Sequence, residues 1–295
     1  MKHWTDKGER GSAWLIHVVV WLARSAGRRA CQLLLYPIVL YFLLTDRTAR
    51  KSSMEFLQTA NGRQPGWRDV FAHIYSFATT LLDRVFMAAG DFGRFDITID
   101  GLELVDAALQ EGKGCVLLGS HLGSFDLLLL AGRAMGQRQI NVMMRVDPRS
   151  RVRRIAGIDD SAFNLIQLGR PDSYLQAHDA LSRGGVVAIL ADRTDGAANL
   201  PVQFLDRKTT MPTAPHILAA RSSAPVLMFF GLYDGGNRYR IKFVECGKTV
   251  APNSRGAGLQ PMVNAYAAVL QTYARHYPLN WFNFYPYWST DGKTP

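Results

Sequence analysis

A histidine and an aspartate stand five residues apart in the segment Gly119-Ser-His-Leu-Gly-Ser-Phe-Asp126. The apolar run Cys115 to Leu118 precedes this segment and the apolar run Leu127 to Ala131 follows it. This order predicts a buried strand, a polar turn and a buried helix. A histidine whose basicity is raised by a carboxylate can activate a hydroxyl group for attack. We therefore predict that His121 is a general base and that Asp126 orients it.

Geometry restricts how these two side chains can meet. Inside one regular helix, residues five apart point about 140° away from each other. His121 must therefore precede the helix, with Asp126 in its first turns, and the glycines at positions 119 and 123 permit such a sharp entry. The backbone N–H groups of Gly123 and Ser124 would then face the site and stabilise an oxyanion. The alternative is a structural histidine, with the aspartate acting only as a helix cap.

Other polar residues follow later predicted strands. Arg145 ends an apolar strand and could brace Asp126 or bind a phosphate group of a substrate. Asp192 and Arg193 follow the strand predicted over residues 186–190 and could close the site from the opposite loop. An equally simple interpretation of this second segment is a helix cap and a turn.

The densest basic cluster lies in residues 147–154. It contains four arginines: Arg149, Arg151, Arg153 and Arg154. Because it follows Arg145, the cluster is expected near the mouth of the site, where it would suit a phosphate group, an acidic protein surface or an anionic lipid headgroup. The alternative is a solvated basic loop with no particular partner.

Composition restricts the class of protein. The 295 residues include 34 basic and 24 acidic side chains, and the formal net charge of +10 favours phospholipid headgroups, acidic proteins or nucleic acid as partners. Cys31, Cys115 and Cys246 lie far apart in apolar surroundings, which indicates reduced, buried thiols. The sequence has no CxxC, HExxH or Walker motif, so we expect no metal and no cofactor.

The N-terminal region favours a membrane. Two apolar runs, Trp14 to Ala23 and Cys31 to Leu44, are separated by Arg24, Arg28 and Arg29. The second run is shorter than the roughly 20 residues that span a bilayer. We expect an interfacial anchor with snorkelling arginines or a single tilted span, and the alternative is a buried helical hairpin. The expected organisation is a membrane-anchoring segment over residues 1–52 and a catalytic domain over residues 53–295.

Beyond the N-terminal region, helical and strand patterns alternate. This alternation predicts an α/β fold with a mostly parallel central sheet flanked by helices, together with the N-terminal membrane-associated helix. The segment Asp234-Gly-Gly-Asn237 predicts a hairpin turn into an antiparallel edge strand. The strands are expected at residues 95–99, 115–118, 140–144, 163–168, 186–190, 225–232 and 239–244.

Several segments together resemble one known family. The His-x4-Asp segment after an apolar strand resembles the signature of the lysophospholipid acyltransferase superfamily. Residues 142–148, 192–196 and 204–212 are similar, in this order, to the next blocks of that superfamily, and the aromatic ending 278–286 resembles the end of the lipid A late acyltransferase branch. One departure leaves the acceptor open: many lipid A acyltransferases have glutamate where this chain has Asp126, and glycerolipid acyltransferases have aspartate.

The resemblance implies an O-acyltransferase that uses the His121–Asp126 pair and no cofactor. A fatty acyl group would move from acyl carrier protein or acyl-CoA to a hydroxyl of a lipid acceptor, at the cytoplasmic face of the cell inner membrane. The residues expected to bind substrate are Arg145, Asp192, Arg193, Arg149 and Arg151.

Rival functions make different demands on the sequence. A serine hydrolase is disfavoured because the chain has no G-x-S-x-G elbow. A metal-dependent glycosyltransferase could use Asp192 and Asp195 as a carboxylate pair. A non-enzymatic membrane lipid-binding or nucleic-acid-binding protein would explain the net charge but not the His–Asp pair, so we expect no nucleic-acid partner.

Overall fold

A seven-stranded sheet forms the centre of the computed structural model, which describes residues 13–134, 140–145, 164–194 and 198–288. The strand order is β1-β9-β8-β2-β5-β3-β4, and all neighbours run parallel except β8 and β9. This confirms the expected mixed α/β fold with a mostly parallel sheet. The strands are β1 (Asp96–Asp100), β2 (Cys115–Gly119), β3 (Ile140–Met144), β4 (Asn164–Gln167), β5 (Val186–Leu190), β8 (Val226–Tyr233) and β9 (Arg238–Glu245).

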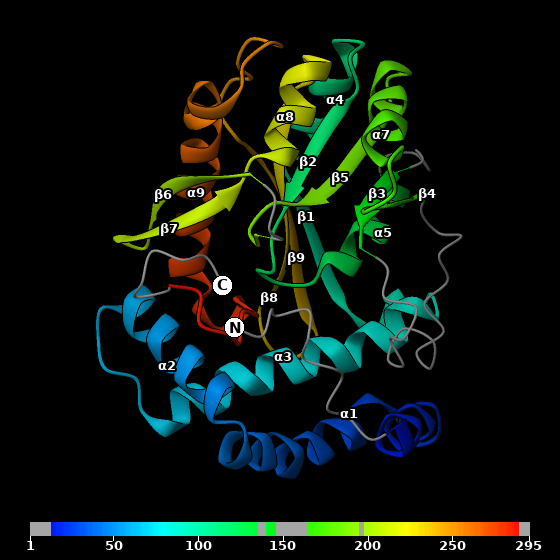
Figure 1. The fold of residues 1–295 in the computed structure, drawn as a ribbon. Coiled ribbons are helices and arrows are strands. Elements are labelled where there is room, and N and C mark those ends of the chain that lie inside the picture. Colours follow the sequence, from blue (N-terminus) through cyan, green and yellow to red (C-terminus); the bar gives the residue numbers. More distant parts are fainter. Residues whose placement is uncertain (1–12, 135–139, 146–163, 195–197, 289–295) are drawn as a thin grey trace.

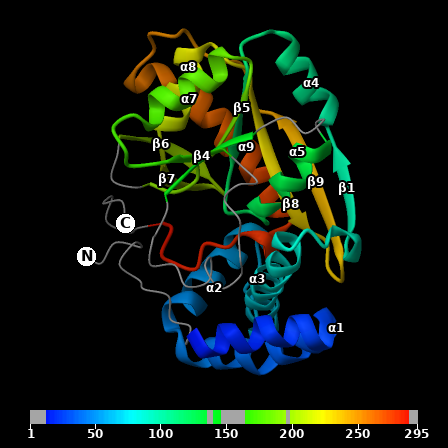
Figure 2. The ribbon, with the colours of Figure 1, turned by 90° about the vertical axis from the view of Figure 1, so that its right-hand side faces the viewer.

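Helices cover both faces of the sheet and one of its ends (Figures 1 and 2). On one face lie α4 (Leu102–Gln110) and α5 (Leu128–Ala134). On the other face lie α7 (Ser173–Ser182), α8 (Ala214–Ser222) and α9 (Gln260–His276). A layer of three helices lies below the sheet in Figure 1: α1 (Ala13–Thr45), α2 (Arg47–Asn61) and α3 (Trp67–Ala88). A separate antiparallel pair, β6 (Asn199–Phe204) and β7 (Arg207–Pro212), was not expected from the sequence.

The central strand β2 shows why apolar runs in this chain form strands. Val116 and Leu118 belong to the core on the α7–α9 face, and Cys115 and Leu117 belong to the core on the α4–α5 face. Both faces of the strand are buried, so its side chains are apolar on both sides. All three cysteines are free and buried, as predicted.

The turn at Asp234–Asn237 joins β8 to β9 in an antiparallel hairpin, as predicted. Gly235 and Gly236 have φ values of 85° and 63°, which suit a glycine-rich hairpin turn. The prediction that β9 is an edge strand was wrong, because β1 pairs with it in parallel and forms the edge.

A buried ion pair joins two helices of the helical layer, and a tyrosine hydroxyl joins this pair to the sheet. Arg28 of α1 binds the fully buried carboxylate of Asp83 on α3 at 2.6 and 2.7 Å, and the Tyr239 hydroxyl of β9 donates to the same carboxylate at 2.7 Å. Burial raises the pKa of Asp83, although Arg28 and Tyr239 act to lower it. A buried carboxylate needs such partners, so this contact fixes α1 against α3 and β9.

Within the described ranges, no single helix is both long and apolar enough to cross a bilayer. The segments Gly27–Thr45 and Arg47–Asn61 pass the same length and composition test only as a pair, with a bend of 95° between them. The boundary expected between residues 52 and 53 falls inside α2. The membrane-associated helix and the two-part organisation therefore stay predictions.

The turn that follows β2 packs directly on the middle of β8. Ser124 N–H donates to the Gly231 carbonyl at 2.7 Å, and Gly123 forms a β-bridge with Gly231. A Cβ atom on Gly231 would lie 2.2 Å from the Ser124 carbonyl oxygen, and one on Gly123 would lie 2.2 Å from the Gly231 carbonyl oxygen. The two main chains can approach this closely only because both positions are glycine.

We predict that Gly231→Ala lowers the free energy of unfolding by about 3 kcal/mol, because the added methyl group meets backbone that cannot move aside. Urea denaturation measures this loss. Gly93→Ala is the matched control, since a Cβ there meets no atom within 4 Å and its φ lies outside the left-handed region. Equal stability of the two variants would contradict the close approach.

Candidate active site

The carboxylate of Asp192, just after β5, is fully buried and holds His121 at two points. The His121 Nδ1 atom lies 2.9 Å from Asp192 Oδ1, and the His121 backbone N–H donates to Asp192 Oδ2 at 3.0 Å. The side-chain amide of Asn283 donates to the same Oδ2 at 3.3 Å. Both the position and the ring orientation of the histidine are therefore set by one carboxylate from a neighbouring strand.

The ionisation of this pair defines which ring nitrogen can act as a base. Burial alone would raise the pKa of Asp192, but the His121 imidazole and the charge of Arg193 outweigh burial and hold the pKa at about 2. An ionised carboxylate only accepts hydrogen bonds, so Nδ1 must carry the proton and Nε2 the lone pair.

The His121 imidazole is neutral and accessible at neutral pH. Burial, then Arg193 and more weakly Arg84, lower its pKa below the ordinary 6.5, although Asp192 acts to raise it. The side chain keeps 27% of its surface exposed. Among the described residues, none forms a hydrogen bond with Nε2, so this lone pair is available to accept a proton.

The backbone around His121 is held by the aromatic C-terminal segment. The His121 carbonyl accepts from Phe282 N–H at 2.8 Å, and Leu122 pairs with Trp281 in an antiparallel bridge. Trp281 is fully buried and Phe282 nearly so, so both belong to the core. The turn cannot shift without breaking these contacts.

The two N–H groups expected to stabilise an oxyanion are already bonded. Gly123 N–H donates to the Asn280 carbonyl at 2.8 Å, and Ser124 N–H donates to the Gly231 carbonyl at 2.7 Å. The turn enters a short 3-10 helix, Phe125–Leu127, rather than a regular helix with free N–H groups at its start. The prediction that Gly123 and Ser124 supply oxyanion donors is therefore corrected.

Asp126 lies on the same turn but binds other partners. Its Oδ2 atom accepts from Arg84 Nε of α3 at 2.6 Å and from the Ser124 hydroxyl at 3.2 Å. In the described part of the chain, no hydrogen bond joins Asp126 to His121. The 3-10 turn places its carboxylate toward α3, so Asp192 takes the orienting position at His121 that the sequence analysis gave to Asp126.

The remaining predicted residues differ in where they lie. Arg193 donates from Nε to Asn283 Oδ1 at 2.6 Å and from an Nη atom to the Phe282 carbonyl at 3.1 Å, so it fixes the C-terminal segment beside the pair. Arg145 is exposed at the end of β3. Arg149, Arg151, Arg153, Arg154 and Asp195 lie outside the described residues.

Three contributors to the site were missed from the sequence: Arg84, Asn280 and Asn283. The two asparagines are almost fully buried within an aromatic segment, and an amide in such surroundings signals a required hydrogen bond. Arg84 stands in an amphipathic helix with no local signal, because its partner Asp126 is 42 residues away.

Comparisons with known proteins relate the sequence to lipid acyltransferases. The family model of the bacterial lipid A biosynthesis acyltransferases matches residues 83–288. A phosphatidylinositol mannoside acyltransferase of Mycobacterium tuberculosis is 28% identical over 206 residues, which cover 67% of this chain and 62% of that protein. The phosphatidylinositol mannoside acyltransferase of Mycolicibacterium smegmatis is 24% identical over 228 residues, which cover 75% of this chain and 72% of that protein.

The alignment thus spans less than two thirds of the Mycobacterium tuberculosis relative. The family match, in contrast, includes His121, Asp126, Asp192 and the C-terminal segment that surrounds them, and it extends over more than half of the chain. The chain belongs to the bacterial lipid A biosynthesis acyltransferase family.

Proposed function

We propose that the protein is an O-acyltransferase that moves a fatty acyl group from a thioester, on acyl carrier protein or coenzyme A, to a hydroxyl of a lipid acceptor. One observation carries the proposal: buried Asp192 binds Nδ1 of a partly exposed His121 whose pKa is lowered, which leaves Nε2 as the basic nitrogen of a neutral ring. Family membership supports acyl transfer to a lipid.

The reaction needs one base and no covalent enzyme intermediate. His121 Nε2 takes the proton of the acceptor hydroxyl as its oxygen attacks the thioester carbonyl carbon. The tetrahedral intermediate collapses, the C–S bond breaks, and the new ester bond remains. The departing thiolate takes the proton from Nε2, which restores the neutral histidine, while Asp192 stabilises the transient imidazolium.

Positive charge near His121 would stabilise the negative charge that develops on the thioester carbonyl oxygen during attack. Arg193 and Arg84 both act to lower the pKa of His121, so their fields reach the reacting atoms. We propose that Asp126 keeps Arg84 in place through the 2.6 Å hydrogen bond from Arg84 Nε to Asp126 Oδ2. Arg145, Arg149 and Arg151 remain proposed contacts for the phosphate groups of the donor.

The acceptor is proposed to be a sugar hydroxyl of a glycolipid. Family membership and the two mycobacterial relatives point to this class, because lipid A and phosphatidylinositol mannosides both carry sugars. Such lipids are met at a membrane surface, so we place the protein at the cytoplasmic face of the inner membrane, with residues 1–52 as the anchoring segment and residues 53–295 as the catalytic domain.

A metal-dependent glycosyltransferase fits this site less well. The Asp192 carboxylate is buried and bonded to His121 and Asn283, so it is not presented to a sugar nucleotide or a metal ion. A lipid-binding protein without activity would not need a partly exposed histidine whose ring is oriented by a buried carboxylate.

The direct experiment supplies purified protein with a radiolabelled acyl group, carried as a thioester on acyl carrier protein or on coenzyme A. The acceptor is either a glycolipid or a lysophospholipid. Label in the glycolipid product supports the full proposal, and label only in the phospholipid product corrects the acceptor. No transfer from either donor to either lipid, by protein that remains folded, would overturn the acyltransferase assignment.

Substitution of the pair should remove the chemistry. We predict that His121→Ala lowers kcat by about 10³-fold, and that Asp192→Asn lowers it by at least about 10²-fold because the ring loses its tautomer and orientation. His276→Ala, at the exposed end of α9, is the matched control and should keep full activity. Full activity of His121→Ala would refute the mechanism.

The pH dependence follows from the lowered pKa of His121. A base with a lowered pKa stays neutral down to a lower pH, so the acid limb of kcat/KM should fall with unit slope and have its midpoint below pH 6.5. In Asp192→Asn, which lacks the carboxylate that raises this pKa, the acid limb should move to still lower pH. An acid limb above pH 6.5 in the wild type would contradict this electrostatic assignment.

A further inference from the structure

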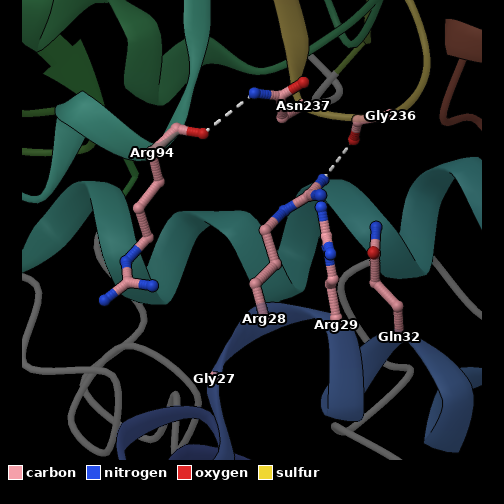
Figure 3. Close-up of a pocket in the computed structure, with 7 residues that line it drawn as sticks. All are labelled: Gly27, Arg28, Arg29, Gln32, Arg94, Gly236 and Asn237. Atoms are coloured by element: carbon pink, nitrogen blue, oxygen red, sulfur yellow. Dashed lines mark hydrogen bonds between the residues drawn. The ribbon is translucent and has the colours of Figure 1, made fainter.

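A pocket of about 550 Å³ lies at the break in α1, away from His121 (Figure 3). Gly27 breaks the helix there, with φ 77° and ψ 175°. The lining residues come from three parts of the chain: Gly27, Arg28, Arg29 and Gln32 of α1, Arg94 before β1, and Gly236 and Asn237 of the β8–β9 hairpin.

The pocket carries positive charge that the protein only partly neutralises. None of the described residues that line it is acidic. Arg28 is balanced by Asp83, and Arg94 pairs with Asp91. Arg29 is exposed, and no contact to a carboxylate is found for it among the described residues. Arginine side chains beside neutral amide donors favour a phosphate group, which accepts several hydrogen bonds at once.

An exposed apolar row begins next to the pocket. Leu33, Pro37, Leu40 and Leu44 follow the spacing of one helical face, and Leu33 is 72% exposed while Leu44 is 61% exposed. The opposite face of α1, with Cys31, Leu35, Val39 and Leu43, is buried. Leu33 stands four residues after Arg29, about 6 Å along the helix axis.

Figures 1 and 2 both show α1 as the outermost helix, beyond α3 on the side away from the sheet. A phosphate pocket that continues into an outward apolar row matches the two parts of a phospholipid, the charged headgroup and the acyl chains. A soluble phosphate compound would use the pocket and leave the apolar row without a partner.

We propose that the pocket binds the phosphate of an anionic phospholipid in the bilayer through Arg29 and Arg94, with the acyl chains lying along Leu33 to Leu44. Arg28 stays bound to Asp83 and to the Gly236 carbonyl. This inference rests on the membrane association proposed above and gives it a specific site.

Vesicle sedimentation of the full chain tests this site. The vesicles are phosphatidylcholine alone or phosphatidylcholine with phosphatidylglycerol. Arg29→Gln combined with Arg94→Gln should weaken binding to the anionic vesicles by about thirtyfold. The control, Arg221→Gln with Arg255→Gln, removes the same charge from exposed positions on α8 and before α9 and should change binding less than threefold. An equal loss in both double variants would overturn the site.

Further measurements distinguish a lipid phosphate from free phosphate, and distinguish lipid binding at the pocket from catalysis at His121. Inorganic phosphate at constant ionic strength should leave the wild type on the vesicles, and full displacement would identify a free-phosphate site instead. Equal wild-type binding to both kinds of vesicle would also overturn the proposal. His121→Ala should bind vesicles like the wild type, and the pocket variant should keep its transferase activity on detergent-dispersed acceptor, so a failure of this site is distinct from a failure of the proposed reaction.

Discussion

The buried carboxylate of Asp192 is the constraint on which the site depends. An ionised group with no exposure to solvent is costly unless it is paired, and here it has three donors: the His121 ring, the His121 backbone N–H and the Asn283 amide. The hydrogen bonds that this carboxylate accepts orient the His121 imidazole, fix its tautomer and hold the turn in place. Loss of any one donor would leave the buried Asp192 carboxylate only partly compensated.

Distant parts of the chain meet at this turn because the sheet is mainly parallel. The end of β2 lies beside the end of β5, which brings His121 to Asp192 across 71 residues, and the C-terminal segment closes over both. The close contact between Gly123 of the turn and Gly231 of β8 fixes the distance between the turn and the sheet. The helix α3 adds Arg84 from the helical layer, and the residue before it, Asp83, binds Arg28 of α1.

The sequence predicted the parts of this structure that depend on local pattern. Apolar runs predicted β2 and β5, and the glycine pair at 235 and 236 predicted the hairpin. The sequence also singled out His121 and Asp192, but it paired His121 with the wrong carboxylate. Spacing favoured the near neighbour Asp126, whereas the strand order, which brings β5 beside β2, is a property of the whole chain. The partners Arg84 and Asn283 were missed for the same reason.

Whether Asp192 or Asp126 orients His121 can be measured by NMR of protein with 15N-labelled histidine. We expect a neutral ring protonated at Nδ1, with a strongly downfield Nδ1 proton resonance that persists in Asp126→Asn and is lost in Asp192→Asn. His121→Ala assigns the signal among the seven histidines. A resonance that survives Asp192→Asn but disappears in Asp126→Asn would show that Asp126 orients the ring instead.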